Sequence, residues 1–331
     1  MTIEESARQV NILCVWPLSS QQLDRIRQVS PSVHLERKVY DPQTLAHHLK
    51  DVEVLCTTYF PLDPVEFPRL RWIQNYGAGI EHLFGLPVLR SDVIVTSAHG
   101  FHGPPMAEYV MAALLGWARR FPQMAEYQRR HEWPNNARQL FSSDGLSGKV
   151  MGILGFGHVG RAIARLARAF DLHVLAMDEA DLAGDPGSAE RLFTPAQLDE
   201  MLPLCDYVVV CLPFTQTTEG LVDKEIFRLM RPHAYFVNVS RGKIVDQAAL
   251  VSALREGWIA GATLDVVVPE PLPSSSELWA CPNLTITPHV SALTYHYDDD
   301  LVDYFCENLR RYLAGQPLLN IVDHERGYVV R

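Results

Sequence analysis

The 331-residue sequence contains no apolar run approaching the roughly 18 residues that suggest a membrane-spanning helix. Its first residues, Met1-Thr-Ile-Glu-Glu5, are polar and acidic, whereas a secretory signal needs a basic start followed by an apolar stretch. We therefore expect a cytoplasmic protein with no membrane partner.

Cysteine pairs and surplus positive charge are also missing. The six cysteines include no Cys-x-x-Cys pair, and several lie in apolar, strand-like runs, so we expect reduced thiols and no metal site. The 29 Lys and Arg are outnumbered by 39 Asp and Glu, which gives a net charge of -10. Because binding to a phosphate backbone depends on surplus cations, we expect no nucleic-acid partner.

The first hundred residues alternate short apolar runs with helical patterns, which is typical of a parallel sheet with crossover helices. The chain is also longer than the roughly 250–300 residues at which a single core stops growing, so two domains are expected. This first series predicts strands at 11–16, 52–56, 70–74 and 93–95 and helices at 21–29 and 41–50.

A long apolar helix is predicted from Pro104 to Arg120, and a second series of the same kind follows it. Its strands are apolar at successive positions, as in Val208-Val-Val210, which is expected when helices cover both faces of a sheet. The predicted fold class is α/β, with two Rossmann-like, doubly wound parallel-sheet domains. The second series predicts strands at 149–154, 173–177, 207–212, 234–239, 262–266 and 284–287, and helices at 159–170, 195–202, 224–230 and 247–256.

The motif Gly155-Phe-Gly-His-Val-Gly160 lies between a predicted strand and a predicted helix, as dinucleotide-binding loops do. Gly155 permits the tight turn, Gly157 lets the backbone approach a pyrophosphate, and Gly160 allows helix and strand to pack closely. Asp178, at the end of the next strand, would accept hydrogen bonds from the adenosine ribose. Because the residues that follow bring no cation for a 2′-phosphate, the sequence favours NAD over NADP.

Three titratable residues follow three predicted strands of the second series, namely Arg241, Glu270 and His289. Ligands of open α/β sheets bind at the carboxyl ends of the strands, so loops from separate strands can bring these side chains together. Each residue alone is commonplace on a protein surface. Their joint placement makes them the candidate catalytic residues.

Four motifs resemble the successive signatures of the D-2-hydroxyacid dehydrogenase family. The resemblance implies an NAD-dependent enzyme, similar to glyoxylate and hydroxypyruvate reductases, that interconverts a small 2-keto acid and its D-2-hydroxy acid. It extends to Gly77-Ala-Gly79, Met106-Ala-Glu108 and Asn320-Ile-Val-Asp323, and so covers nearly the whole chain. The four motifs are Gly155-Phe-Gly-His-Val-Gly-Arg161, Val239-Ser-Arg-Gly-Lys-Ile-Val-Asp246, Gly261-Ala-Thr-Leu-Asp-Val266 with Pro269-Glu-Pro-Leu272, and Thr287-Pro-His-Val290.

The resemblance implies a role for each candidate residue. Arg241 would bind the substrate carboxylate and polarise the carbonyl, and His289 would exchange a proton with the alkoxide. Glu270 would orient His289 and favour its protonated form. Substrate would contact Tyr76, Gly77, Ala78, Gly79, Arg241 and His289, with the backbone N–H groups of Ala78 and Gly79 completing the carboxylate site. The cofactor would contact Gly155, Gly157, His158, Val159, Gly160, Asp178, Leu212, Pro213, Thr218, Val239, Ser240, Arg241, Asp265 and His289, with Asp265 at the nicotinamide carboxamide.

The resemblance also implies a discontinuous architecture. Residues 1–100 and 292–331 would form a flavodoxin-like substrate domain, and the NAD-binding Rossmann domain, residues 101–291, would be inserted into it. Closure of the two would exclude water from hydride transfer. A homodimer is implied as well, with the apolar helix from Pro104 as part of its interface.

Several positions depart from the family pattern on the substrate side, and they leave the identity of the 2-keto acid open. They are Ser97, Glu81-His82, Val267-Val268 and Tyr295, to which the aromatic residues Tyr76 and Trp133 add further pocket candidates. Two other functions stay open at this point. One is a formate or phosphite dehydrogenase-like enzyme, although formate enzymes carry Gln where Glu270 stands. The other is a dinucleotide-sensing corepressor or scaffold, which would bind NADH without turning over keto acids.

Overall fold

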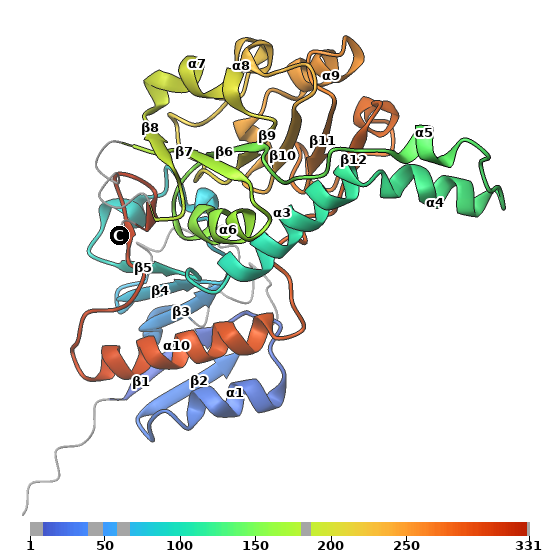
Figure 1. Ribbon diagram of the computed structural model, residues 1–331. Coiled ribbons are helices and arrows are strands. Elements are labelled where there is room, and N and C mark those ends of the chain that lie inside the picture. The colour runs from blue at the N-terminus through green and yellow to red at the C-terminus, as the bar shows by residue number, and fades with distance from the viewer. Residues whose placement is uncertain (1–8, 39–48, 58–66, 180–186, 330–331) are drawn as a thin grey trace, which may run out of the picture. The chain divides into compact units, whose positions relative to one another are not determined.

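The computed structural model describes residues 9–38, 49–57, 67–179 and 187–329. The chain divides into two compact units (Figure 1): unit 1 comprises Met1–Phe101 with Thr294–Arg331, and unit 2 comprises His102–Leu293. Most of the helix predicted at 41–50 lies outside the described residues. Among those described, no helix is both long enough and apolar enough to cross a membrane.

Unit 1 is built on a five-stranded sheet whose neighbouring strands are all parallel, in the order β2-β1-β3-β4-β5. This is the strand order of the flavodoxin-like doubly wound fold. The strands are β1 (Val10–Cys14), β2 (Val33–Arg37), β3 (Val54–Thr57), β4 (Trp72–Asn75) and β5 (Ile94–Ser97), and a short antiparallel pair, β13 (Val322–Asp323) and β14 (Tyr328–Val329), lies near the C-terminus.

Two helices, α1 (Ser20–Arg27) and α10 (Tyr297–Leu313), pack their apolar sides with one face of the unit 1 sheet into a common core. Helix α1 begins after Ser19, which forms a reciprocal capping box with the residue three positions on and so satisfies two backbone donors of the first turn. The guanidinium of Arg25 donates to the Asp299 carboxylate at 2.7 Å, which joins α1 to α10. Helices α1 and α10 therefore belong to one unit although they lie far apart in the sequence.

Unit 2 is built on a seven-stranded parallel sheet in the order β12-β11-β10-β9-β6-β7-β8. Counted from its own first strand, this is the Rossmann order with a seventh strand added, and the order reverses between β6 and β9. The strands are β6 (Val150–Leu154), β7 (His173–Met177), β8 (Arg191–Phe193), β9 (Tyr207–Val210), β10 (Tyr235–Asn238), β11 (Gly261–Leu264) and β12 (Leu284–Ile286). The helices are α3 (Gly103–Ala118), α4 (Phe121–Arg129), α5 (Ala137–Phe141), α6 (His158–Ala169), α7 (Leu198–Met201), α8 (Lys224–Leu229) and α9 (Gln247–Arg255).

Helices cover both faces of the unit 2 sheet. Figure 1 shows α3 and α6 on one face and α7, α8 and α9 on the other. Neighbouring residues of one strand therefore enter different cores: Val208 packs with α7 to α9, and Val209 packs with α3 and α6. This is why the central strands are apolar at every position.

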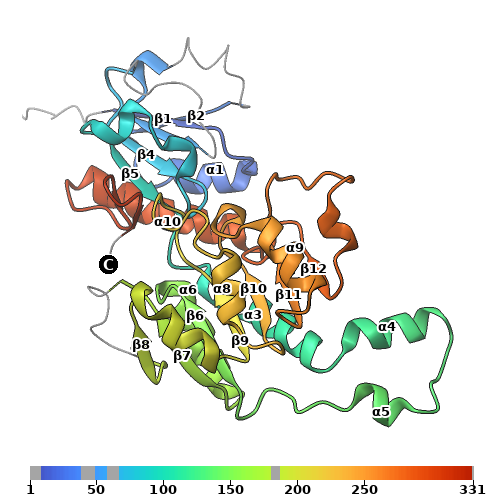
Figure 2. The ribbon, with the colours of Figure 1, turned by 90° about the horizontal axis from the view of Figure 1, so that it is seen from above.

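Residues 119–145 leave unit 2 as an extended arm that contains α4 and α5 (Figure 2). Neither of these helices buries a single residue. The arm exposes two large apolar side chains, Phe121 and Trp133.

The predicted α/β fold class, with doubly wound parallel sheets, is confirmed. The strands predicted in both series are present, with ends that differ by at most two residues. Strands β2 and β8 and helix α10 were not predicted. In β2 only Leu35 is buried, so the strand lacks the apolar run that marks a central strand, and β8 has only three residues.

Candidate active site

The three candidate catalytic residues lie on loops at the carboxyl ends of three adjacent strands of unit 2. Arg241 follows β10, Glu270 follows β11 and His289 follows β12, and β10, β11 and β12 are neighbours in the sheet. The strand order alone therefore brings the three loops to one edge.

His289 and Glu270 form a hydrogen-bonded pair. The Nδ1 atom of His289 lies 2.8 Å from Oε2 of Glu270, and the other carboxylate oxygen of Glu270 accepts a hydrogen bond from the Val267 backbone N–H at 3.1 Å. The two side chains are 47% and 38% exposed, respectively. Glu270 is thus held by its own loop and orients the imidazole, which leaves Nε2 as the ring nitrogen that can meet a substrate.

The backbone of His289 is in the left-handed region, with φ of 55°, a conformation that costs energy for a residue with a side chain. Asp265 holds it there: its carbonyl accepts from the His289 N–H at 2.8 Å, and its carboxylate accepts from the N–H groups of Val290 and Ser291, both at 2.9 Å. Asp265 is only 1% exposed. The structure thus shows it fixing the loop that carries His289, which the sequence motif alone did not reveal.

Tyr109 of α3 adds a further contact to this loop. Its hydroxyl lies 2.5 Å from the Thr287 hydroxyl, which in turn donates to the Asp265 carboxylate at 2.6 Å. Burial raises the pKa of Tyr109 to about 12, so its hydroxyl is neutral at physiological pH. Sequence reasoning missed Tyr109 because its partner lies 178 positions away.

The Arg241 loop packs directly against the loop that leads to Glu270. A methyl group on Gly242 would lie 2.4 Å from the carbonyl carbon and oxygen of Val267, a distance that only glycine permits. Asn238 fixes the turn from the other side, since its amide nitrogen donates to the Arg241 carbonyl at 3.1 Å. The close approach requires glycine next to Arg241 and brings the two loops together.

The glycine motif forms a turn at the point where the strand order reverses. Gly155 has φ of 99°, and a Cβ there would lie 2.8 Å from the Leu212 backbone nitrogen. A Cβ on Gly160 would lie 2.1 Å from the Gly155 carbonyl oxygen. Gly157 is the N-cap of α6, and no side chain caps that helix end. The turn therefore leaves backbone N–H groups at a positive helix terminus, which fits a pyrophosphate.

The remaining predicted cofactor residues surround this turn. Asp178 accepts hydrogen bonds from the N–H groups of Phe156 and Glu179, both at 2.8 Å, so its carboxylate holds the glycine loop. On the β9 side, the Thr218 hydroxyl donates to the Pro213 carbonyl at 2.8 Å, and the Ser240 hydroxyl donates to the Leu212 carbonyl. His158 and Val159 begin α6, and Val239 is buried beside Ser240.

In unit 1, the loop Tyr76–Gly79 follows β4 at the carboxyl edge of its sheet. The Tyr76 hydroxyl donates to the Asp298 carboxylate, and Ala78 is exposed. The residues that depart from the family pattern have varied environments. Ser97 and Val267 are buried, Glu81 and His82 are partly buried, Val268 is exposed, and Tyr295 and Trp133 are almost fully exposed.

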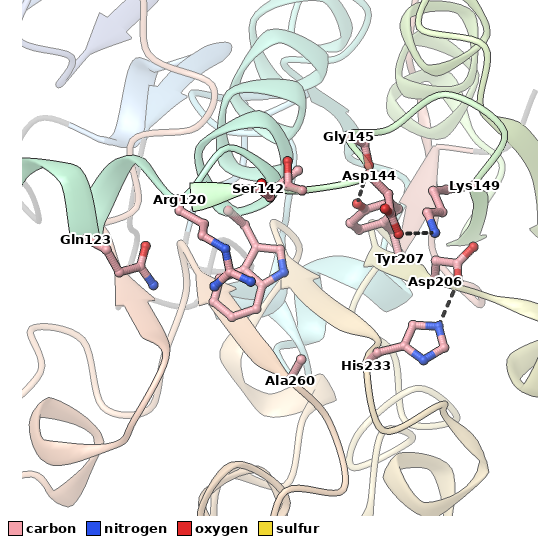
Figure 3. Close-up of a pocket in the computed structure, with 13 residues that line it drawn as sticks. Arg120, Gln123, Ser142, Asp144, Gly145, Lys149, Asp206, Tyr207, His233 and Ala260 are labelled. Carbon is pink, nitrogen blue, oxygen red and sulfur yellow. Dashed lines mark hydrogen bonds and ion pairs between the residues drawn. The ribbon is translucent and has the colours of Figure 1, made fainter. Parts of the chain in front are cut away.

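A cavity of about 360 Å³ lies at the opposite, amino edge of the unit 2 sheet (Figure 3). Lys149, Asp206, His233 and Ala260, which line it, each precede a strand of the sheet. Among these lining residues, Nε2 of His233 lies 2.9 Å from Oδ1 of Asp206. Because Arg241, Glu270 and His289 lie at the carboxyl edge, this cavity is separate from the candidate catalytic site. No group of side chains suited to a metal ion occurs in the ranges that the structure describes.

Residues 111–291 match the NAD binding domain of the D-isomer specific 2-hydroxyacid dehydrogenases, more than half of the chain. The chain belongs to this family. This D-isomer specific 2-hydroxyacid dehydrogenase is 32% identical to a glyoxylate reductase of Pyrococcus furiosus over 298 residues, 88% of each protein.

Two solved structures resemble the dehydrogenase over almost its full length. A family member from Aeromonas salmonicida has 30% identity and a TM-score of 0.82, covering 96% of this chain and 99% of its own. A D-isomer specific 2-hydroxyacid dehydrogenase from Xanthobacter autotrophicus Py2, in complex with NADPH and MES, has 30% identity and a TM-score of 0.80, covering 97% of this chain and 100% of its own.

Proposed function

We propose that this dehydrogenase reduces a small 2-keto acid to its D-2-hydroxy acid, and catalyses the reverse reaction, with His289, Glu270 and Arg241 as catalytic residues. The observation that carries the proposal is the 2.8 Å pair of His289 and Glu270 at the carboxyl edge of the sheet. The dinucleotide turn at Gly155 lies at the same edge of the same sheet. When bound, the nicotinamide supplies or accepts the hydride.

His289 is proposed to handle the proton. During reduction its Nε2 would donate a proton to the oxygen that gains negative charge as C2 is reduced, and during oxidation it would accept that proton. Glu270 would keep the ring in the orientation that this transfer needs. Asp265 supports the role because it locks the backbone conformation of His289.

Arg241 is proposed to bind the substrate carboxylate, since a guanidinium matches a carboxylate with two parallel hydrogen bonds. The loop Tyr76–Gly79 of unit 1 is proposed to bind the same carboxylate through the backbone N–H groups of Ala78 and Gly79. This assigns substrate recognition to residues 1–100 and 292–331 and cofactor binding to residues 101–291. The division of the chain into two compact units is compatible with that assignment.

For the cofactor, we propose NAD, held by the sequence-predicted set from Gly155 to His289. Asp178 supports this choice because a carboxylate next to a ribose 2′-phosphate is repulsive. The Xanthobacter relative was solved with NADPH, so the choice needs a direct test. The test compares kcat/KM for NADH and NADPH with one keto acid; a preference for NADPH would contradict the assignment.

For the substrate, we propose the smallest 2-keto acids, glyoxylate and hydroxypyruvate, because the Pyrococcus relative is a glyoxylate reductase. The test follows NADH oxidation with glyoxylate, hydroxypyruvate, pyruvate and phenylpyruvate, and we expect the two smallest to have the highest kcat/KM. A highest kcat/KM with phenylpyruvate would contradict the substrate class. NADH binding without turnover of any keto acid would contradict the enzymatic proposal and indicate a dinucleotide sensor.

We also propose a homodimer that uses α3 and the arm, because the arm exposes two large apolar side chains, Phe121 and Trp133, which a second copy of the chain would cover. The molar mass in solution, measured by light scattering, should be twice the 37.3 kDa of the chain. The double variant Phe121→Glu, Trp133→Glu should shift the mass toward that of one chain. A wild-type mass of one chain would contradict the proposal.

A further inference from the structure

Three neighbouring strands of unit 1 end in buried polar residues on the same face of the sheet. Thr57 of β3, Asn75 of β4 and Ser97 of β5 are direct partners in the strand register. All three are buried. The residues two positions earlier on the same face, Leu55, Ile73 and Val95, are apolar and form a hydrophobic core. The polar row thus replaces the apolar core at the carboxyl edge, beneath the loop that follows β4.

Asn75, the centre of this row, binds the loop through its side chain. Its Nδ2 atom donates to the carbonyl oxygen of Gly77 at 2.9 Å and to that of Gly79 at 2.8 Å. The Ala98 N–H adds a third hydrogen bond, to Gly77 O at 3.1 Å. Two carbonyl dipoles of the loop are therefore turned toward the sheet.

The backbone N–H groups of the same loop are left for another partner. Within the part of the chain that the structure describes, those of Gly77, Ala78 and Gly79 donate no hydrogen bond. Ala78 is exposed and both glycines are partly exposed. A loop whose carbonyl oxygens are bound from below while its N–H groups stay free can attract an anion, because those N–H groups carry positive partial charge.

Burial of Asn75 and Ser97 also carries a free-energy cost that packing does not explain. Asn75 Oδ1 and Ser97 Oγ are buried atoms with no hydrogen-bond partner among the residues that the structure describes. An apolar residue at either position would continue the core of Leu55, Ile73 and Val95 and would avoid that loss of free energy. A buried amide kept at such a cost indicates a function for its other end, the two donor bonds to the loop.

We propose that Asn75 is the positioning residue of the substrate-carboxylate site: it pins the carbonyl groups of Gly77 and Gly79 so that the intervening N–H groups face the anion. The inference rests on the proposed function, in which the Ala78 and Gly79 N–H groups bind a 2-keto carboxylate. Asn75 itself touches no substrate, because its side chain is buried under the loop. Its effect is on carboxylate binding and not on the chemical step.

The test replaces Asn75 by a residue of similar shape without donors, Asn75→Leu, and compares it with Gln74→Met. Gln74 is the matched control because it is the preceding residue, is equally buried, and carries an amide that donates to the backbone on the opposite face of the sheet. Each variant loses one buried amide. Only the Asn75 variant loses the two hydrogen bonds to the carbonyl groups of Gly77 and Gly79.

We expect Asn75→Leu to raise KM for the keto acid by about tenfold or more, with kcat within about threefold of wild type and NADH affinity unchanged. Gln74→Met should lower the melting temperature without a comparable change in KM. Asn75→Ala is the second variant if the leucine variant does not fold. A KM equal to wild type, or equal proportional losses of activity in the Asn75 and Gln74 variants, would overturn the inference.

A second measurement separates this inference from the proposed function. Oxalate, a dianion shaped like a 2-keto carboxylate, is titrated calorimetrically into the NADH complex of each protein. If wild type binds oxalate but turns over no keto acid, weaker binding by Asn75→Leu supports the anion loop while the reductase proposal fails. If Asn75→Leu binds oxalate as tightly as wild type, or if wild type binds none, the anion loop is wrong.

Discussion

The two parallel sheets of this dehydrogenase carry different kinds of polar group at their carboxyl edges. Unit 2 places ionisable side chains there, Arg241, Glu270 and His289, and fixes the loop of His289 through the buried Asp265. Unit 1 places neutral side chains there, and through Asn75 it turns a backbone loop outward. The same fold principle thus supplies a charged edge in one unit and an edge of backbone dipoles in the other.

This difference suggests a division of labour. Proton transfer needs a side chain that gains and loses a proton, which a backbone N–H group cannot do. Binding of a carboxylate needs only fixed donors, and backbone groups provide them without the entropy of a long side chain. We therefore expect substitutions at the unit 2 edge to lower kcat, and substitutions at the unit 1 edge to raise KM.

His289→Ala should have the largest effect. Loss of the proton donor should lower kcat by about a hundredfold to ten-thousandfold, with little change in NADH affinity. His233→Ala is the matched control, because His233 lies at the amino edge of the same sheet. Steady-state kinetics of keto-acid reduction measure both. A normal kcat for His289→Ala would remove the residue from the chemistry and end the division between the units.

Arg241→Ala should have the next largest effect and should test whether the division is strict. Arg241 belongs to the charged edge yet is assigned to the substrate carboxylate, so the variant should have both a lower kcat and a higher KM. We expect kcat/KM to fall by at least about tenfold to a hundredfold, equivalent to roughly 1.5–3 kcal/mol for a hydrogen bond to a charged group. Arg241→Lys keeps the positive charge but cannot form the two parallel hydrogen bonds of a guanidinium, so it should recover only part of the lost kcat/KM. Wild-type kcat/KM of Arg241→Ala across a panel of keto acids would refute the binding of the substrate carboxylate by Arg241.

Asp265→Asn examines the support beneath the charged edge. The substitution keeps the shape but removes the charge and one acceptor from a carboxylate that holds the N–H groups of Val290 and Ser291. We expect the free energy of unfolding to fall by about 1–3 kcal/mol and kcat to fall about tenfold, because the loop that holds His289 in its left-handed conformation would be fixed less firmly. Chemical denaturation and kinetics measure the two effects. A loss of stability with unchanged kcat would show that the loop geometry does not limit the reaction.

The sequence predicted the functional residues at the carboxyl edge of unit 2 much better than those at the carboxyl edge of unit 1. Arg241, Glu270 and His289 are chemically distinctive residues that follow apolar strands, so their position at one sheet edge could be inferred from the strand pattern. Asn75 gave no such signal, because an asparagine at a strand end usually indicates only a turn. Its role depends on two carbonyl groups that the loop conformation brings within reach.

The fold, too, could be predicted only where the sequence carries a distinctive local pattern. Central strands such as β9 are apolar at every position because both faces are covered, and those strands were found. Strand β2 lies at the sheet edge with charged residues and one buried leucine, so its sequence resembles a loop. Asp265 was noticed as a motif residue, but its bonds to the loop of His289 run across about 25 positions and leave no local pattern.

Tyr109→Phe should have the smallest effect and should show how far the support of the charged edge extends into α3. The variant removes the hydroxyl that contacts Thr287 but leaves the bond from Thr287 to Asp265 intact. We expect a loss of about 1 kcal/mol in the free energy of unfolding and a kcat within about threefold of wild type.

Because burial raises the pKa of Tyr109 from 10.0 to about 12, the phenol stays neutral below pH 9, and the pH profile of kcat should keep its shape. Above pH 10 the unfolded chain loses this proton more readily than the folded chain, so wild-type stability should fall with rising pH more steeply than that of the variant. A kcat loss as large as that of His289→Ala would instead place the Tyr109 hydroxyl in the proton-transfer step and extend the chemistry beyond the three strand-end loops.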